Sequence, residues 1–190
     1  MHKTAASPLA LMYAVLIVYA SLYPFVDWRD QAIVPWAFLT APFPRYWTRF
    51  DAAINIVGYL PLGSMLALSA LRTGRSSQAF GVSILLGAGL SLAMEMLQSY
   101  LPVRVPSRED WLLNSVGVAL GAGMTIVLER LGAIDRWSRF RARWFVPNAR
   151  GGLVLLATWP MALLFPAAVP FGLGQVFERI ETDLAGQLAD

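Results

Sequence analysis

Residues 79–101 read AFGVSILLGAGLSLAMEMLQSYL, an apolar stretch in which Glu95 is the single charged side chain. A helix crosses the hydrocarbon core of a bilayer with about 20 mostly apolar residues. Three other stretches of similar length, 8–26, 52–71 and 111–128, contain no charged residue. The sequence therefore predicts an all-α protein, a polytopic integral membrane helical bundle.

The composition agrees with this class of protein. Hydrophobic residues make up 57% of the chain, charged residues 14%, and the mean hydropathy is +0.54. Soluble domains usually contain about a quarter charged residues. The chain has no cysteine, which excludes disulfides, thiolate metal sites and a cysteine nucleophile. Its net charge of +3 is accompanied by no nucleic-acid motif, so no nucleic-acid partner is predicted.

A fifth uncharged run, 151–177, is interrupted by three prolines. Proline kinks or breaks a helix, so we predict a kinked span, or a span followed by a segment near the interface. The predicted organisation is a four-helix membrane domain over 1–130, a basic amphipathic linker over 131–150, and a fifth span with an extracytoplasmic tail over 151–190. The last part could also be the start of a longer C-terminal region.

The first apolar stretch has an alternative interpretation as a signal peptide. Lys3 precedes it, and residues 18–20 read VYA, which resembles a cleavage site. The uncharged run continues to Val26, however, and further spans follow. We therefore favour a first transmembrane span.

Basic residues are distributed unequally between the two sides that five spans would create. The side with the N-terminus holds nine lysines and arginines, and the opposite side six. Cytoplasmic loops are enriched in these residues, so we predict a multi-pass membrane protein with a cytoplasmic N-terminus. The linker supplies most of the excess, and its apolar residues recur as in an amphipathic helix lying on the anionic inner leaflet: Leu131, Ile134, Trp137, Phe140 and Trp144.

On the opposite side, residues 27–51 contain three prolines among many aromatic side chains. The prolines prevent one long helix, and the aromatic content is high for a freely solvated loop. We expect this segment to fold back onto the outer interface.

A short repeat carries the polar residues of the spans. Residues 51–58 read DAAINIVG and residues 110–117 read DWLLNSVG, so both follow the pattern D-x-x-x-N-x-V-G. Two spans separate equivalent positions, which predicts a parallel pseudo-repeat of helical hairpins. The aspartates are placed where helix N-caps are wanted, and Gly117 and Gly121 form a G-x-x-x-G pair typical of close helix packing.

The polar residues of three spans fall at similar depths. Asn55 and Asn114 lie about 6 Å inward from their aspartates, and Glu95 lies about 9 Å inward from the end of its span. Gln98 shares a helix face with Glu95. Ionised groups in lipid need a partner, for which Arg104 and Arg108 are the nearest candidates. These groups either converge on a site in the outer half of the bundle or form a polar clamp that fixes helix register.

Three segments together resemble the VanZ-like family of bacterial membrane proteins: RFDAAINIVGYLPLG at 49–63, EMLQ at 95–98 and SREDWLLNSVGVALG at 107–121. The resemblance implies that the family pattern falls on Asp51, Asn55, Pro61, Gly63, Glu95, Gln98, Arg108, Asp110, Asn114 and Gly117. Family members often have another acidic residue at the turn before the fourth span, where this chain reads Pro106-Ser107. A metal or acid-base role that needs this carboxylate is weakened here.

The founding member of the family is associated with resistance to teicoplanin, a lipid-tailed glycopeptide antibiotic, and no reaction is firmly assigned to the family. The shared depth of the polar residues and the aromatic outer segment favour, as a first hypothesis, a non-catalytic envelope protein of the bacterial cytoplasmic (inner) membrane. Its partners would be membrane lipids, or a lipid-linked cell-envelope precursor at the outer leaflet. The hypothetical ligand-binding residues are Asp51, Asn55, Glu95, Gln98, Arg108, Asp110 and Asn114. Pro61, Gly63, Gly117 and Gly121 are assigned structural roles.

Two alternatives stay open. One is an intramembrane enzyme acting on a lipid-linked substrate, with Asp51, Glu95 and Asp110 as acid-base groups or magnesium ligands. Against it, the one histidine is His2 at the N-terminus, and no nucleophile motif or phosphate-binding loop is present. The other is a small transporter, suggested by the parallel repeat. No catalytic residue, metal or cofactor is predicted.

Overall fold

A computed structural model describes residues 6–42, 49–144, 152, 155–156 and 159. These residues form helices and loops and contain no strand, which confirms the all-α class. In chain order the elements are α1 (Ala6–Leu22), η1 (Ala37–Leu39), α2 (Arg49–Arg72), η2 (Ser76–Gln78), α3 (Ala79–Gln98), α4 (Arg108–Arg130) and α5 (Ala133–Trp144). All of them belong to the first of two compact units, Met1–Val146. The predicted fifth span, 151–177, lies outside the described residues apart from a few positions.

Three helical segments are long and apolar enough to cross a membrane: Arg49–Arg72, Ser76–Gln98 and Arg108–Arg130. They confirm a membrane helical bundle. The remaining predicted span corresponds to α1, which is shorter, with 17 residues. It ends at Leu22, before its apolar stretch does, because the residue ahead of Pro24 is disfavoured in a helix and Phe25 and Asp27 adopt positive φ angles of 64° and 60°.

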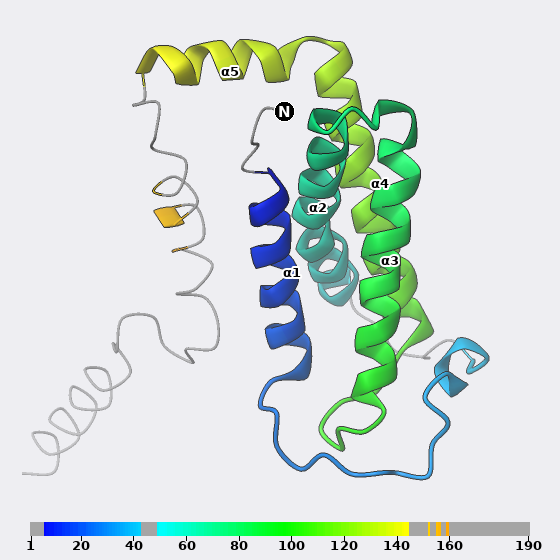
Figure 1. The fold of residues 1–190 in the computed structure, drawn as a ribbon. Helices are drawn as coiled ribbons and strands as arrows, with labels where there is room; N and C mark the ends of the chain where they lie inside the picture. Colours follow the sequence, from blue (N-terminus) through cyan, green and yellow to red (C-terminus); the bar gives the residue numbers. More distant parts are fainter. Residues whose placement is uncertain (1–5, 43–48, 145–151, 153–154, 157–158, 160–190) are drawn as a thin grey trace, which may run out of the picture. The chain divides into compact units, whose positions relative to one another are not determined.

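In the bundle, α1 and α3 run in one direction and α2 and α4 in the other (Figure 1). Helices α2 and α4 run in the same direction, as the repeat predicted, since Asn55 faces Asp110 and Ser64 faces Gly121 further along both helices. Helix α3 runs opposite to them. Helix α1 lies antiparallel to α2. The Tyr13 hydroxyl of α1 donates to the Gly58 carbonyl of α2 at 2.9 Å.

Glycines bring the backbones of α2 and α4 into direct contact. A Cβ atom on Gly117 would overlap the carbonyl of Ile56, and one on Gly121 would overlap the carbonyl of Leu60. On α2, a Cβ on Gly63 would overlap the backbone of Val118. Small residues permit such close approach, and packing of this kind is a main source of helix association in lipid. Pro61 lies inside α2, which continues through it.

The two copies of the repeat differ in their surroundings. A Cβ on Gly58 would meet nothing within 4 Å, whereas its equivalent, Gly117, is pressed against α2. The repeat is therefore symmetric in helix direction but not in contacts.

The segment between α1 and α2 returns across the end of the bundle (Figure 1). The backbone N–H of Arg29 donates to the Tyr100 carbonyl at 3.0 Å, and the Gln31 side chain donates to the Ser99 carbonyl at 2.7 Å. Phe38 in η1 is buried, whereas Trp36, the residue before η1, is exposed. The segment is thus fastened to the turn that follows α3.

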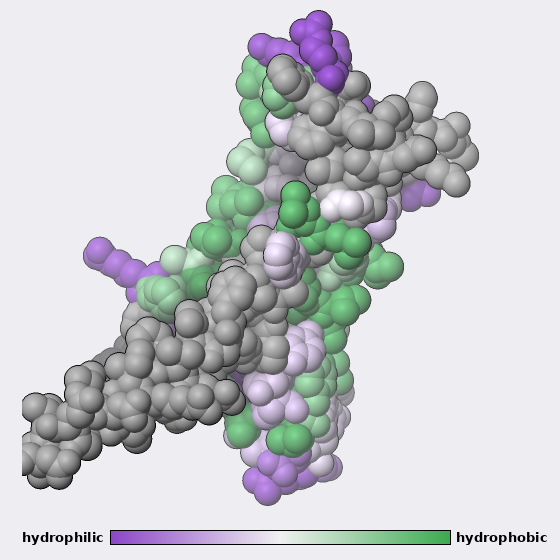
Figure 2. Space-filling model, turned by 90° about the vertical axis from the view of Figure 1, so that its left-hand side faces the viewer, coloured by the Kyte–Doolittle hydropathy of each residue, from purple (hydrophilic) through white to green (hydrophobic). Residues whose placement is uncertain are grey.

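Apolar side chains cover the outside of the helices. Figure 2 shows hydrophobic residues along the middle of the bundle and hydrophilic residues at both ends. Among them, Leu85 is 74% exposed and Val57 is 62% exposed. Exposure of this kind suits a surface in contact with lipid rather than water.

Candidate functional site

Between α2, α3 and α4, toward the end of the bundle where α4 begins, lies a polar cluster. We define it as Asn55 and Tyr59 of α2, Ser91 and Glu95 of α3, and Asp110 and Asn114 of α4. Each helix contributes two residues that are four positions apart and therefore share one face. Four of these side chains, Tyr59, Ser91, Glu95 and Asn114, are buried. The three polar faces meet where α2, α3 and α4 pack together.

Two side-chain hydrogen bonds connect the helices of the polar cluster. The Asn55 amide donates to the Asp110 carboxylate at 2.8 Å, which joins α2 to α4. The Asn114 amide donates to the Ser91 hydroxyl at 3.0 Å, which joins α3 to α4. Because α4 makes both bonds, it holds the central position in the cluster.

Glu95 is held by the start of α4. Its carboxylate accepts a hydrogen bond from the backbone N–H of Ser107 at 2.8 Å, and the residue is only 4% exposed. Ser107 is also the N-cap of α4, since its hydroxyl accepts from the backbone N–H groups of Glu109 and Asp110. One serine therefore both caps a helix and positions the buried acid.

This arrangement corrects the predicted roles of the aspartates. Asp110 is the third residue of α4, and Asp51 is the third residue of α2, so neither occupies the N-cap position. Because Ser107 caps α4, the Asp110 carboxylate is available for Asn55. The family departure at Pro106-Ser107 thus supplies the capping residue.

The carboxyl groups of Glu95 and Asp110 are bonded to neutral donors, the Ser107 backbone N–H and the Asn55 amide. The expected arginine partners lie elsewhere: Arg104 donates to the carbonyls of Ala20 and Tyr23, at 3.1 and 3.0 Å. The prediction that Arg104 pairs with Glu95 is wrong, because two backbone carbonyls at the C-terminal end of α1 accept hydrogen bonds from the Arg104 guanidinium.

Three of the predicted site residues lie outside the polar cluster. Gln98 donates to the Ser21 carbonyl at 3.0 Å and so joins α3 to α1. Arg108 donates to the Leu39 carbonyl at 3.4 Å, beside η1. Asp51 is exposed at the start of α2. The structure therefore brings together Asn55, Glu95, Asp110 and Asn114 from the predicted set.

Tyr59 and Ser91 belong to the polar cluster but were missed from the sequence. Each lies four residues from a predicted site residue, Tyr59 after Asn55 and Ser91 before Glu95. That spacing places both on the polar face of their helix. This spacing could have identified them from the sequence, although tyrosine and serine are common in apolar spans.

Two buried polar atoms of the cluster have no hydrogen-bond partner: the Tyr59 hydroxyl and the Asn114 side-chain carbonyl. The hydroxyls of Ser91 and Ser21 lie near Tyr59 without bonding to it in good geometry. Leaving a buried polar atom unsatisfied costs about 1–3 kcal/mol. A bound polar group that supplied an acceptor to Tyr59 and a donor to Asn114 would recover this free energy.

The described residues contain no group of three or more histidine, cysteine, aspartate or glutamate side chains that could hold a metal ion. Asp51, Glu95 and Asp110, which the sequence offered as magnesium ligands, do not form such a group. The amide, hydroxyl and carboxyl groups of the polar cluster can form hydrogen bonds with a polar ligand.

A bundle of apolar helices enclosing one polar cluster defines a polytopic helical membrane protein with a candidate site between its spans. The chain belongs to the VanZ/LLP1 family, whose sequence model matches residues 7–129. The match confirms the resemblance found over 49–121 and extends it through α1, so it covers every residue of the polar cluster. No curated protein and no solved structure matches the chain.

Proposed function

We propose that this VanZ-like membrane protein binds a lipid or lipid-linked envelope molecule at the polar cluster, which the ligand reaches from the outer leaflet. The observation that carries the proposal is the pair of unsatisfied buried atoms, the Tyr59 hydroxyl and the Asn114 carbonyl. Polar groups inside a membrane are costly and are commonly functional. Three helices supply them here around one point.

The chemistry of the cluster restricts the ligand. Tyr59 offers a donor and Asn114 an acceptor, which suits hydroxyl and amide groups such as those of sugars and peptides. The carboxyl groups of Glu95 and Asp110 belong to the same cluster and disfavour a phosphate there. The part of the ligand that enters the cluster is therefore an uncharged polar group, while an acyl or isoprenoid chain stays in the surrounding lipid.

The charges at the two ends of the bundle support this orientation. Among the described residues, the end that carries α5 has seven arginines and two acidic residues. The end that carries the loop between α3 and α4 has four arginines and five acidic residues. Basic segments stay in the cytoplasm, so the polar cluster lies toward the outer leaflet of the inner membrane.

A matched pair of tyrosine variants tests the proposal. Full-length protein in nanodiscs is exposed to a lipid-linked peptidoglycan precursor that bears a photoreactive chain, and crosslinking is quantified. Tyr59→Phe removes a hydroxyl that makes no hydrogen bond of good geometry within the protein. We therefore expect crosslinking to fall about tenfold while stability is kept, which corresponds to about 1.4 kcal/mol of ligand affinity.

Tyr13→Phe is the control, because the Tyr13 hydroxyl is already bonded to the Gly58 carbonyl. This variant should lose about 1 kcal/mol of stability and retain crosslinking. Undiminished crosslinking of Tyr59→Phe would exclude binding at the cluster.

We extend the proposal to lipid-tailed glycopeptides, because the founding member of the family is associated with resistance to teicoplanin. Cells that express the protein should become less susceptible to teicoplanin but not to a glycopeptide without an acyl tail. Tyr59→Phe should abolish the difference. An equal response to both antibiotics would contradict this extension, and the proposal of lipid binding would then be judged by the crosslinking experiment alone.

A further inference from the structure

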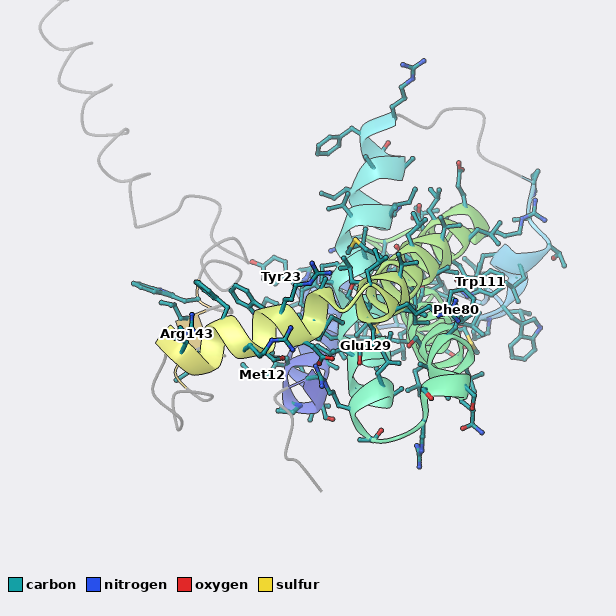
Figure 3. The ribbon with its side chains drawn as sticks, turned by 90° about the horizontal axis from the view of Figure 1, so that it is seen from above. Met12, Tyr23, Phe80, Trp111, Glu129 and Arg143 are labelled. Atoms are coloured by element: carbon teal, nitrogen blue, oxygen red, sulfur yellow. The ribbon has the colours of Figure 1, made fainter. Side chains whose placement is uncertain are left out.

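Helix α5 turns away from the bundle at the basic end. Gly132, with a φ of 68°, separates it from α4. Arg136 fastens this turn by donating to the carbonyls of Leu131 and Gly132, and Asp135 forms an ion pair with Arg72 of α2 at 3.6 Å. As Figures 1 and 3 show, α5 runs across the direction of the spans instead of extending α4.

One side of α5 presents apolar rings that the bundle does not cover. Trp137 is 59% exposed and Phe140 is 49% exposed, and the two rings stack with centroids 5.6 Å apart. Leu131, at the start of the turn, is 61% exposed. Because Trp137 and Phe140 are three residues apart, they lie on one side of α5.

Exposed arginines lie beside these rings on α5. Arg136, Arg139 and Arg143 recur at three- and four-residue steps, and all three are exposed. In helical projection Arg139 and Arg143 lie about 160° and 120° from Trp137, and about 100° and 60° from Phe140. A helix whose aromatic stripe is flanked by arginines is the type that lies within an anionic membrane surface.

The position of α5 favours a lipid partner over a nucleic acid or a soluble protein. Only one turn separates it from α4, a helix long and apolar enough to cross the membrane. A helix that follows a span so closely belongs at the level where acyl chains meet headgroups, and tryptophan is enriched at this depth. The same end of the protein carries seven arginines against two acidic residues, which complements anionic headgroups.

We propose that α5 lies in the surface of the leaflet at the basic end of the bundle and binds anionic phospholipids there. The rings of Trp137 and Phe140 insert below the headgroups, and Arg139 and Arg143 contact phosphate groups. The interaction concerns the side of the membrane opposite to the polar cluster and does not depend on ligand binding at that cluster.

The absence of cysteine from the sequence allows a direct test with single spin labels on the full chain. Phe140→Cys reports on the apolar stripe. Ser138→Cys reports on a position about 200° away from it around the helix axis. The labelled proteins are placed in nanodiscs of phosphatidylcholine, with or without phosphatidylglycerol. Label accessibility is then measured with oxygen, which partitions into lipid, and with a water-soluble nickel complex.

With phosphatidylglycerol present, we expect the label at 140 to be accessible to oxygen and protected from nickel, and the label at 138 to show the reverse. Arg139→Gln with Arg143→Gln should release α5, with roughly a fivefold loss of the bound population for each arginine. The matched control, Arg139→Lys with Arg143→Lys, keeps the charge and should retain the insertion. Arg136 is left in place because it holds the turn.

Equal accessibility at 140 and 138 in anionic nanodiscs would overturn the proposal. So would identical behaviour of the glutamine and lysine variants, because the attraction would then not be electrostatic. Protection of the label at 140 only after adding RNA or a soluble protein fraction would reassign the surface to another partner. Ligand crosslinking at the polar cluster should be unchanged in all α5 variants, which separates failure of this inference from failure of the proposed function.

Discussion

Ser107 shows how one residue outside the apolar spans determines what residues inside them do. Its hydroxyl caps α4, and its backbone N–H binds Glu95. A serine N-cap satisfies backbone donors without adding a charge, so Asp110 is left to bond Asn55 across the helix interface. The polar cluster therefore depends on a residue whose own side chain is not part of it.

The Asn55–Asp110 bond predicts an energetic coupling between these two residues. In a double-mutant cycle of Asn55→Ala and Asp110→Ala, unfolding in detergent should give a coupling of about 0.6–1.7 kcal/mol, the range found for hydrogen bonds within membranes.

The repeat supplies the control pair for this cycle, Asp51 and Asn114. The Asn114 amide is bonded to Ser91, so Asp51→Ala and Asn114→Ala should show no coupling. Equal coupling in the two pairs would contradict the asymmetric arrangement described above.

At the scale of elements, the contact between α2 and α4 depends on glycines of unequal importance. Gly117 and Gly58 are equivalent in the repeat, yet only Gly117 approaches another backbone. Sequence symmetry alone would assign the same role to both residues. Their environments differ because α4 is packed between α2 and α3, whereas Gly58 faces open space beyond α2.

Alanine substitutions should separate the two glycines. Gly117→Ala places a methyl group against the Ile56 carbonyl and should reduce the free energy of unfolding by about 1–3 kcal/mol, as overpacking does. Gly58→Ala meets nothing within 4 Å and should change it by no more than about 0.5 kcal/mol. Unfolding of both purified variants in one detergent provides the measurement, and equal losses would refute the assignment.

For the whole molecule, the charge difference between the two ends predicts a single orientation. Residue 75 precedes η2 at the basic end, and Val105, which is 83% exposed, lies in the loop before α4. In intact cells, a membrane-impermeant thiol reagent should label Val105→Cys and not Arg75→Cys. Permeabilised cells should show labelling of both, which serves as the control. The opposite pattern in intact cells would place the polar cluster toward the cytoplasm.

The sequence alone determined the class of protein, the approximate positions of four helices and most residues of the polar cluster. Hydropathy and length are properties of the chain itself, and a polar residue in an apolar span is conspicuous before any folding. Glu95, Asn55, Asp110 and Asn114 were therefore found directly.

Only the tertiary structure decided how these residues are paired and which neighbours complete the cluster. Helix rotation and depth result from the fit of one surface against another, which hydropathy does not encode. For this reason the pairing of Asn55 with Asp110, the hold of Ser107 on Glu95, and the inclusion of Tyr59 and Ser91 were not predicted. Composition selects the medium in which a chain folds, whereas complementary packing selects the contacts that form within it.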